Sequence, residues 1–118
     1  MGRGLSDAFH RAPRRNLACQ FPDDPKLRPA LIVSLDVRNE LANSVLAVPI
    51  TTNLRPSPTH VSLPAKQGGL MQDSMARCEN VSYLHKSRLS RGPLGNPISA
   101  PLMREVERCL LRSLGITA

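Results

Sequence analysis

The densest apolar run of the chain lies in residues 28–35, where Ala30 to Val33 follow one another without a polar side chain. A run of this length and density predicts a strand that is buried on both faces or lies at a strand crossing. Pro29 is expected at the start of this strand, because proline donates no hydrogen bond to a β ladder. The pattern thus predicts one central strand over residues 28–35.

Shorter apolar or alternating segments predict further strands before and after the central one. Pro49 marks an edge or a bulge in one of them, and residues 59–63 alternate polar and apolar side chains as a half-buried strand does. Turn chemistry separates the segments at residues 22–26 and 67–69. The predicted strands are residues 16–21, 44–51, 59–63 and 74–83, the last broken near residues 79–80.

Two segments predict helix. Residues 36–43 contain good helix formers after a capping aspartate, enough for about one or two turns. At the other end of the chain, Ser99 is the expected N-cap of a longer helix that stops at Gly115. Its apolar residues recur at helical spacing, which predicts one face packed on the sheet. These residues are Leu102, Met103, Val106, Leu110 and Leu114.

Five or six short strands with one C-terminal helix, and without regular βα alternation, favour an α+β fold that is mainly β. A small, partly closed antiparallel barrel fits this pattern better than a doubly wound sheet. The 118 residues suffice for one compact domain. We therefore expect one domain over residues 16–118, preceded by a flexible basic arm over residues 1–15.

The charge of the chain predicts an anionic partner. Sixteen Lys and Arg stand against nine Asp and Glu, giving a formal net charge of +7, as in many nucleic-acid-binding proteins. Only three aromatic residues, Phe9, Phe21 and Tyr83, are available to stack on bases. Binding of a nucleic acid would therefore depend on contacts to phosphates and on polar contacts.

The remaining composition narrows the class of protein. The three cysteines, Cys19, Cys78 and Cys109, form no Cys-x-x-Cys pair, so neither a disulfide framework nor a metal site is predicted. No apolar run approaches the roughly 20 residues of a membrane span. The N-terminal segment contains arginines but no apolar core, so we expect no signal peptide and a cytoplasmic protein.

An arginine and two hydroxyl groups flank the predicted strands in an arrangement suited to a phosphate. Arg28 precedes the central strand, and Thr51 and Thr52 end another. From the residues alone, other interpretations stay open. Arg28 would be a solvated edge residue, the threonines would be ordinary β formers, and Arg77 and Glu79 would share a strand face and only neutralise each other.

Several short motifs, in this order and spacing, resemble the ribonuclease toxins of the MazF, Kid and PemK type, which share a fold with the gyrase poison CcdB. The resemblance covers residues 16–116. It implies an SH3-like barrel, a homodimer that holds single-stranded RNA in grooves at its interface, and inhibition by an acidic antitoxin. The motifs are Arg28–Ser34, Val48–Thr52, Pro58–Val61, Gly68–Leu70, Asp73–Ser74 and Leu102–Val106.

The resemblance also implies catalytic residues for RNA cleavage without a metal or other cofactor. In that reaction the ribose 2′-hydroxyl attacks its own phosphate and leaves a cyclic phosphate and a 5′-hydroxyl. Arg28 matches an arginine that stabilises the phosphate, and Thr51 matches a threonine that hydrogen-bonds the same group. Arg77 and Glu79 resemble an arginine–carboxylate pair in which the arginine is the acid and the carboxylate the base.

Four further residues are expected to contact RNA: Thr52, Arg55, His60 and Ser74. His60 matches a histidine found in some members, which could touch a base or move a proton; its alternative is a half-buried strand residue. The function predicted is that of a sequence-specific endoribonuclease toxin. Two alternatives are a CcdB-like gyrase poison without nuclease activity and an inactive regulator that only binds its antitoxin, and Arg28 together with Thr51 favours the nuclease.

Overall fold

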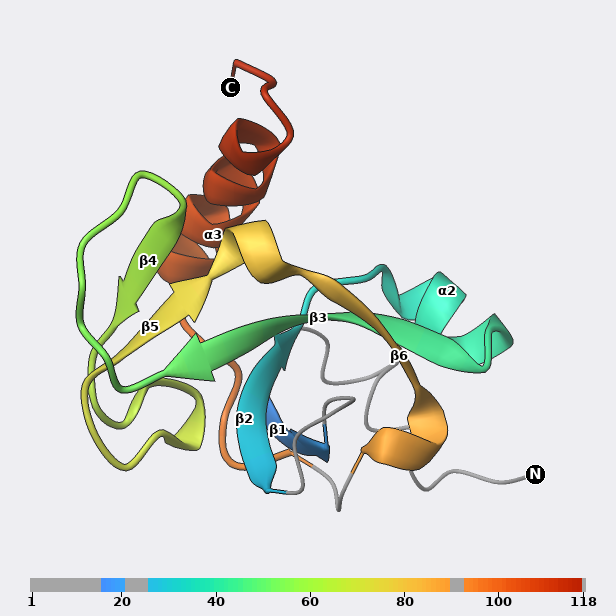
Figure 1. Ribbon diagram of the computed structural model, residues 1–118. Coiled ribbons are helices and arrows are strands. Elements are labelled where there is room, and N and C mark those ends of the chain that lie inside the picture. Colours follow the sequence, from blue (N-terminus) through green and yellow to red (C-terminus); the bar gives the residue numbers. More distant parts are fainter. Residues whose placement is uncertain (1–15, 21–25, 90–92, 118) are drawn as a thin grey trace.

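The computed structural model describes residues 16–20, 26–89 and 93–117. Six antiparallel strands form one open sheet in the order β1-β2-β3-β5-β4, with β6 paired to β3 as well (Figure 1). The predicted arm over residues 1–15 and the turn residues 22–25 lie outside the described residues. The strands are β1 Asn16–Gln20, β2 Leu27–Ile32, β3 Ser44–Thr51, β4 His60–Leu63, β5 Ser74–Arg77 and β6 Ser82–His85.

The central strand β2 is buried on both faces, as its apolar run predicted. Leu31 belongs to the larger of two hydrophobic clusters, whereas Ala30 and Ile32 belong to the smaller one. Successive side chains of a strand point to opposite faces, so β2 separates the two clusters. Strand β3 does the same, with Val48 in the larger cluster and Ala47 in the smaller.

The two strand prolines lie where a missing N–H group costs no ladder hydrogen bond. Pro29 is the third residue of β2 rather than its first, and the pairing of β2 with β3 begins one residue later, at Ala30. Pro49 lies where β3 changes partner: residues 44–47 pair with β6 and residues 50–51 with β5. The strand edge or bulge expected at Pro49 is thus a change of partner strand.

The segment predicted as broken β structure over residues 74–83 forms two strands joined by a 3-10 turn. This turn, η2, spans Cys78–Asn80 and lies between β5 and β6. Glu79 therefore lies in the turn, and the expectation that it shares a strand face with Arg77 is wrong. Because η2 redirects the chain, β5 pairs with the end of β3 and β6 with its first half (Figure 1).

The C-terminal helix α3, Ala100–Ser113, covers one side of the sheet (Figure 1). It begins as predicted, because the Ser99 hydroxyl accepts a hydrogen bond from the N–H of Leu102. After its last turn Gly115 adopts a positive φ of 78°, a conformation that favours glycine. Cys109, which the apolar pattern did not include, is buried against the sheet, whereas Leu114 is 70% exposed and does not face the core.

The short helix α2, Asp36–Leu41, forms where it was expected but without its predicted cap. Asp36 is the first helical residue, and the N-cap position is taken by Leu35, which makes no side-chain capping hydrogen bond. Instead, buried Asn39 hydrogen-bonds to both the hydroxyl and the carbonyl of Ser34. This network fixes the connection between β2 and β3. No helix of the described residues has the length and apolar character needed to cross a membrane.

Candidate active site

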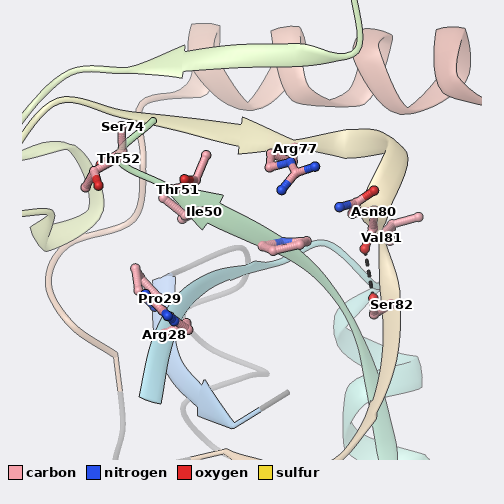
Figure 2. A pocket seen from close by; sticks show the side chains of 11 residues that line it. Arg28, Pro29, Ile50, Thr51, Thr52, Ser74, Arg77, Asn80, Val81 and Ser82 are labelled. Carbon is pink, nitrogen blue, oxygen red and sulfur yellow. Dashed lines mark hydrogen bonds between the residues drawn. The ribbon is translucent and has the colours of Figure 1, made fainter. Parts of the chain in front are cut away.

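A cavity of about 700 Å³ lies where β2, β3, β5 and η2 meet (Figure 2). Three of the four predicted catalytic residues line it, namely Arg28, Thr51 and Arg77. Two of the predicted RNA contacts, Thr52 and Ser74, line it as well. Predicted site residues as far apart in the sequence as Arg28 and Arg77 thus border one cavity.

The strand ends position these side chains. Arg28 comes from β2, next to Pro29, and Thr51 is the last residue of β3. Figure 2 shows Arg28 on one side of the cavity and Arg77 on the other, with Asn80 beyond Arg77. Two guanidinium groups from different strands therefore border the same space.

Thr51 has a hydroxyl proton available for a ligand. Its oxygen accepts a hydrogen bond from the N–H of Asn53 at 3.1 Å. A threonine hydroxyl carries one donor in addition to its acceptor positions, and this contact leaves the donor unused. Thr51 can therefore donate a hydrogen bond to an oxygen atom bound in the cavity.

The cavity is suited to an anion. Apart from its two arginines, its polar lining consists of hydroxyl groups and one amide, and no carboxylate of the described residues lines it. Guanidinium groups bind phosphate oxygens through planar, paired N–H groups. Asn80 and Ser82 belong to this lining and were missed from the sequence, because their approach depends on the turn η2.

His60, Glu79 and Arg55 form a second cluster outside the cavity lining. The Nε2 atom of His60 lies 3.1 Å from Oε2 of Glu79, and Nδ1 lies 3.1 Å from the carbonyl oxygen of Arg55. Both partners are acceptors, so both contacts are hydrogen bonds only when the imidazole carries two protons. His60 therefore lies between the loop after β3 and η2, and it donates one hydrogen bond in its neutral form and two when it carries both protons.

Arg77 belongs to both groups of residues. It pairs with His60 across β4 and β5, and its Nη2 atom lies 4.0 Å from Oε2 of Glu79. Its Nε atom is buried and has no hydrogen-bond partner. The side chain is 43% exposed and also lines the cavity, so the terminal part of its guanidinium lies between Glu79 and the cavity.

The pKa of Glu79 is lowered by its neighbours. Partial burial raises the pKa of this carboxyl, but hydrogen bonds from Thr59 and His60 act in the opposite direction and outweigh it. A carboxylate with a lowered pKa stays ionised to lower pH and is a weaker base. Glu79 therefore carries a negative charge that faces His60 and Arg77.

This pKa shift predicts an acid-dependent contribution to stability. Replacing Glu79 by Gln should lower the thermal unfolding midpoint at neutral pH, because the folded protein favours the ionised carboxylate. The difference from the wild type should shrink as the pH falls below the usual carboxyl value of 4.5, where the wild type also takes up the proton. Unfolding curves measured by circular dichroism between pH 3 and pH 7, a range of roughly four units around that pKa, would test it.

The control is Glu105→Gln, which removes an exposed carboxylate of α3 and thus the same charge. A difference between wild type and Glu79→Gln that stays constant down to the lowest pH would contradict the assignment.

Neither Cys78 nor Cys109 lines the cavity. Cys78 and Cys109 are free, buried thiols, and burial raises the pKa of Cys78. Within the described ranges, no group of His, Cys, Asp and Glu side chains is arranged to hold a metal ion.

Comparison with solved structures identifies similar folds. A Mycobacterium tuberculosis toxin, MazF-mt6, matches with a TM-score of 0.78 and 26% identity, over 89% of this chain and 100% of that one. A mycobacterial endoribonuclease solved with its cognate antitoxin matches with a TM-score of 0.75 and 28% identity, over 91% of this chain and 99% of that one. The predicted mainly β fold with a C-terminal helix is therefore confirmed.

Sequence comparison identifies a curated relative and a matching family model. Endoribonuclease EndoA of Bacillus subtilis is 30% identical over 66 residues, which are 54% of this chain and 57% of that protein. The match thus spans a little over half the length of this curated relative. The family model described as PemK-like, MazF-like toxin of type II toxin-antitoxin system matches residues 16–114. Since this match takes in all six strands and α3, the chain belongs to the family of PemK-like and MazF-like toxins of type II toxin–antitoxin systems.

Proposed function

We propose that the protein is a sequence-specific endoribonuclease that cleaves single-stranded RNA without a metal ion. The observation that carries this proposal is the cavity in which Arg28, Thr51 and Arg77 meet. Its two cations and its hydroxyl groups can bind a phosphodiester and stabilise the charge that grows on it. The names of a curated relative and of a solved neighbour, both endoribonucleases, support the same activity.

In the proposed reaction, the ribose 2′-oxygen attacks the adjacent phosphorus and the bond from phosphorus to the 5′-oxygen breaks. The products are a 2′,3′-cyclic phosphate and a 5′-hydroxyl. Arg28 binds the two non-bridging oxygens through its planar guanidinium, and Thr51 donates its remaining hydroxyl proton to the same phosphoryl group. These two residues act on the charge that develops in the transition state.

Proton transfer is assigned to the other side of the cavity. Arg77 faces the leaving 5′-oxygen as the acid, and Glu79 receives the proton of the 2′-hydroxyl as the base. Glu79 does not line the cavity, and His60 already occupies one of its oxygens. His60 in its neutral form is therefore the second candidate for the base, and binding of RNA would have to release the contact of its unprotonated ring nitrogen.

The RNA strand is proposed to continue past the cavity in both directions. Thr52 and Ser74 lie at one end of the lining in Figure 2 and are assigned to the sugar–phosphate backbone. Ser74 would contact it as an acceptor, since its own proton is donated to the carbonyl oxygen of Gln72. Arg55 is exposed on the loop after β3 and, with His60, is assigned to the other direction. A formal net charge of +7 favours a polyanion along this path.

The proposed partners follow from the family. Solved relatives include one bound to its cognate antitoxin, and we assign an acidic antitoxin to this chain too. A disordered acidic segment that folds over the cavity would compete with RNA for Arg28. The protein is proposed to act as a homodimer in the cytoplasm.

Cleavage in the presence of EDTA tests the proposed function. The purified protein is incubated with a long RNA of mixed sequence, and the cut sites and end groups are mapped. We expect cuts at a discrete sequence, with cyclic phosphate and 5′-hydroxyl ends, because the reaction uses the protein's own side chains. RNA that stays intact at high protein concentration would contradict the proposal and favour a gyrase poison of the CcdB type or an inactive regulator.

A further inference from the structure

A second, smaller cavity borders the candidate active site. Its volume is about 240 Å³, and it shares Ser74 with the larger cavity. Its wall combines the loop after β3, the end of β4 and the start of β5. The other residues that matter are Leu54, Ser62, Pro64, Asp73 and Met75.

The polar side chains of this cavity offer acceptors and no free proton. The hydroxyl of Ser62 donates to the sulfur of Met75 at 3.3 Å, and that of Ser74 donates to the carbonyl oxygen of Gln72 at 2.9 Å. Asp73 is a carboxylate, which only accepts. These side chains therefore favour a ligand group that donates hydrogen bonds.

One oxygen of the Asp73 carboxylate is hydrogen-bonded within the protein, and the other remains available to a ligand. Its Oδ1 atom accepts the N–H of Ala65 at 2.8 Å, across the loop between β4 and β5. The contact fixes the carboxylate beside the cavity without using Oδ2. An ionised carboxylate accepts several hydrogen bonds, so Asp73 can take a further donor from a ligand.

The rest of the wall is apolar and partly open. Leu54 is 50% exposed at the rim, and Pro64 and Met75 add further apolar surface. No aromatic side chain of the described residues lines either cavity. The cavity thus combines an apolar wall with acceptor groups on one part of its lining. A flat ring with polar edges, such as a nucleobase, fits this combination.

We propose that the smaller cavity is a nucleobase subsite, and that Asp73 selects a base with an exocyclic amino group over uracil. The role as an RNA subsite depends on the proposed nuclease function, since the shared Ser74 links it to the phosphate site. Cytosine and adenine present an amino donor that a carboxylate accepts, as in protein–DNA contacts to cytosine. Uracil has no amino group: its one ring donor, N3–H, stands between two carbonyl oxygens, and these oxygens would face acceptors in this cavity.

The inference is tested with oligonucleotides that the protein cannot cleave. Deoxycytidine and deoxyuridine decamers carry no 2′-hydroxyl, and their binding is measured by fluorescence anisotropy. We expect the wild type to prefer the cytosine decamer by about tenfold, the range for one good base contact. Asp73→Asn keeps an oxygen for the Ala65 N–H but adds an amide donor, so the preference should vanish or reverse.

The matched control is Glu105→Gln, which removes one negative charge from the exposed face of α3 and should leave the cytosine-to-uracil ratio unchanged. The ratio is the readout because a change in net charge alters the affinity for both decamers alike. A wild type without preference, or an Asp73→Asn variant with the wild-type ratio, would overturn the inference.

Cleavage of long RNA separates this inference from the proposed function. If the wild type cuts RNA but Asp73→Asn has the wild-type ratio, the subsite is wrong and the nuclease stands. If the ratio changes in Asp73→Asn but the wild type leaves RNA intact, the base-selective cavity stands and the nuclease is wrong. If the wild type cuts RNA and Asp73→Asn loses the cytosine preference, the two proteins should differ in their cut sites. At one position of the cleaved sequence, Asp73→Asn should accept uracil and the wild type should not.

Discussion

Arg28→Ala is expected to lower RNA cleavage by about 10²- to 10³-fold while the fold stays intact, the usual loss for one donor to a developing oxyanion. Arg28 lies at the cavity, and its neighbours in the sheet are positioned by main-chain pairing of β2 with β1. Truncating the side chain therefore removes the phosphate contact without opening the hydrophobic clusters. The rate of cut-site formation under saturating RNA would measure the loss, and a circular dichroism spectrum would check the fold.

The control for Arg28→Ala is Arg104→Ala, an exposed arginine of α3 outside the cavity lining. It removes the same charge and should leave the rate near the wild-type value. Arg28→Lys separates charge from geometry, because lysine keeps the cation but cannot bind two oxygens with one planar group. Full activity of Arg28→Ala would remove this residue from the catalytic assignment.

The elements that the sequence predicted best are those whose local pattern and tertiary environment agree. Strand β3 has the predicted bounds, Ser44–Thr51, because its apolar residues face a hydrophobic cluster on either side. Helix α3 has its predicted N-cap at Ser99 and its predicted end before Gly115. Leu114 follows the apolar period, but it lies beyond the last helical residue and has no sheet beneath it.

The site was predicted less completely, because its geometry depends on contacts between distant segments. Arg28 and Thr51 flank strands that the sequence indicates, so their approach to one cavity could be expected. The sequence predicted a break near residues 79–80, where η2 lies, but the spacing of Arg77 and Glu79 fits a strand equally well and did not predict where these side chains lie. The turn moves Glu79 away from the cavity lining and brings Asn80 into it.

The same limit applies to the smaller cavity. Asp73 belongs to one of the short motifs and precedes Ser74, an expected RNA contact, but the sequence predicted no role for Asp73 itself. The hydrogen bond to Ala65 and the orientation of two serine hydroxyls give it a role only in the folded chain. The role of such a loop residue depends on the donors and acceptors that the folded chain places around the cavity.

Arg77→Ala is expected to lower the cleavage rate by about 10²- to 10³-fold, within the range for loss of an acid–base group. The loss should fall on kcat more than on KM, because the proposed proton transfer from Arg77 to the leaving oxygen takes place only in the transition state. Single-turnover cleavage of a short RNA that contains one cut site would measure it. A rate within tenfold of the wild type would exclude Arg77 as the acid.

Glu79→Gln separates the two possible roles of the carboxylate beside Arg77. Glutamine keeps the shape of the side chain and can still accept a hydrogen bond from His60, but it cannot take up a proton. If Glu79 is the base, the loss of cleavage rate in Glu79→Gln should match that in Arg77→Ala. The rate loss in the double variant should then be smaller than the two single losses combined. A much smaller loss would mean that Glu79 only orients Arg77 and His60. This role agrees with the position of Glu79 outside the cavity lining and with its contact to His60 at 3.1 Å. His60→Gln then becomes the decisive variant, because the imidazole would remain as the group that accepts the 2′-hydroxyl proton.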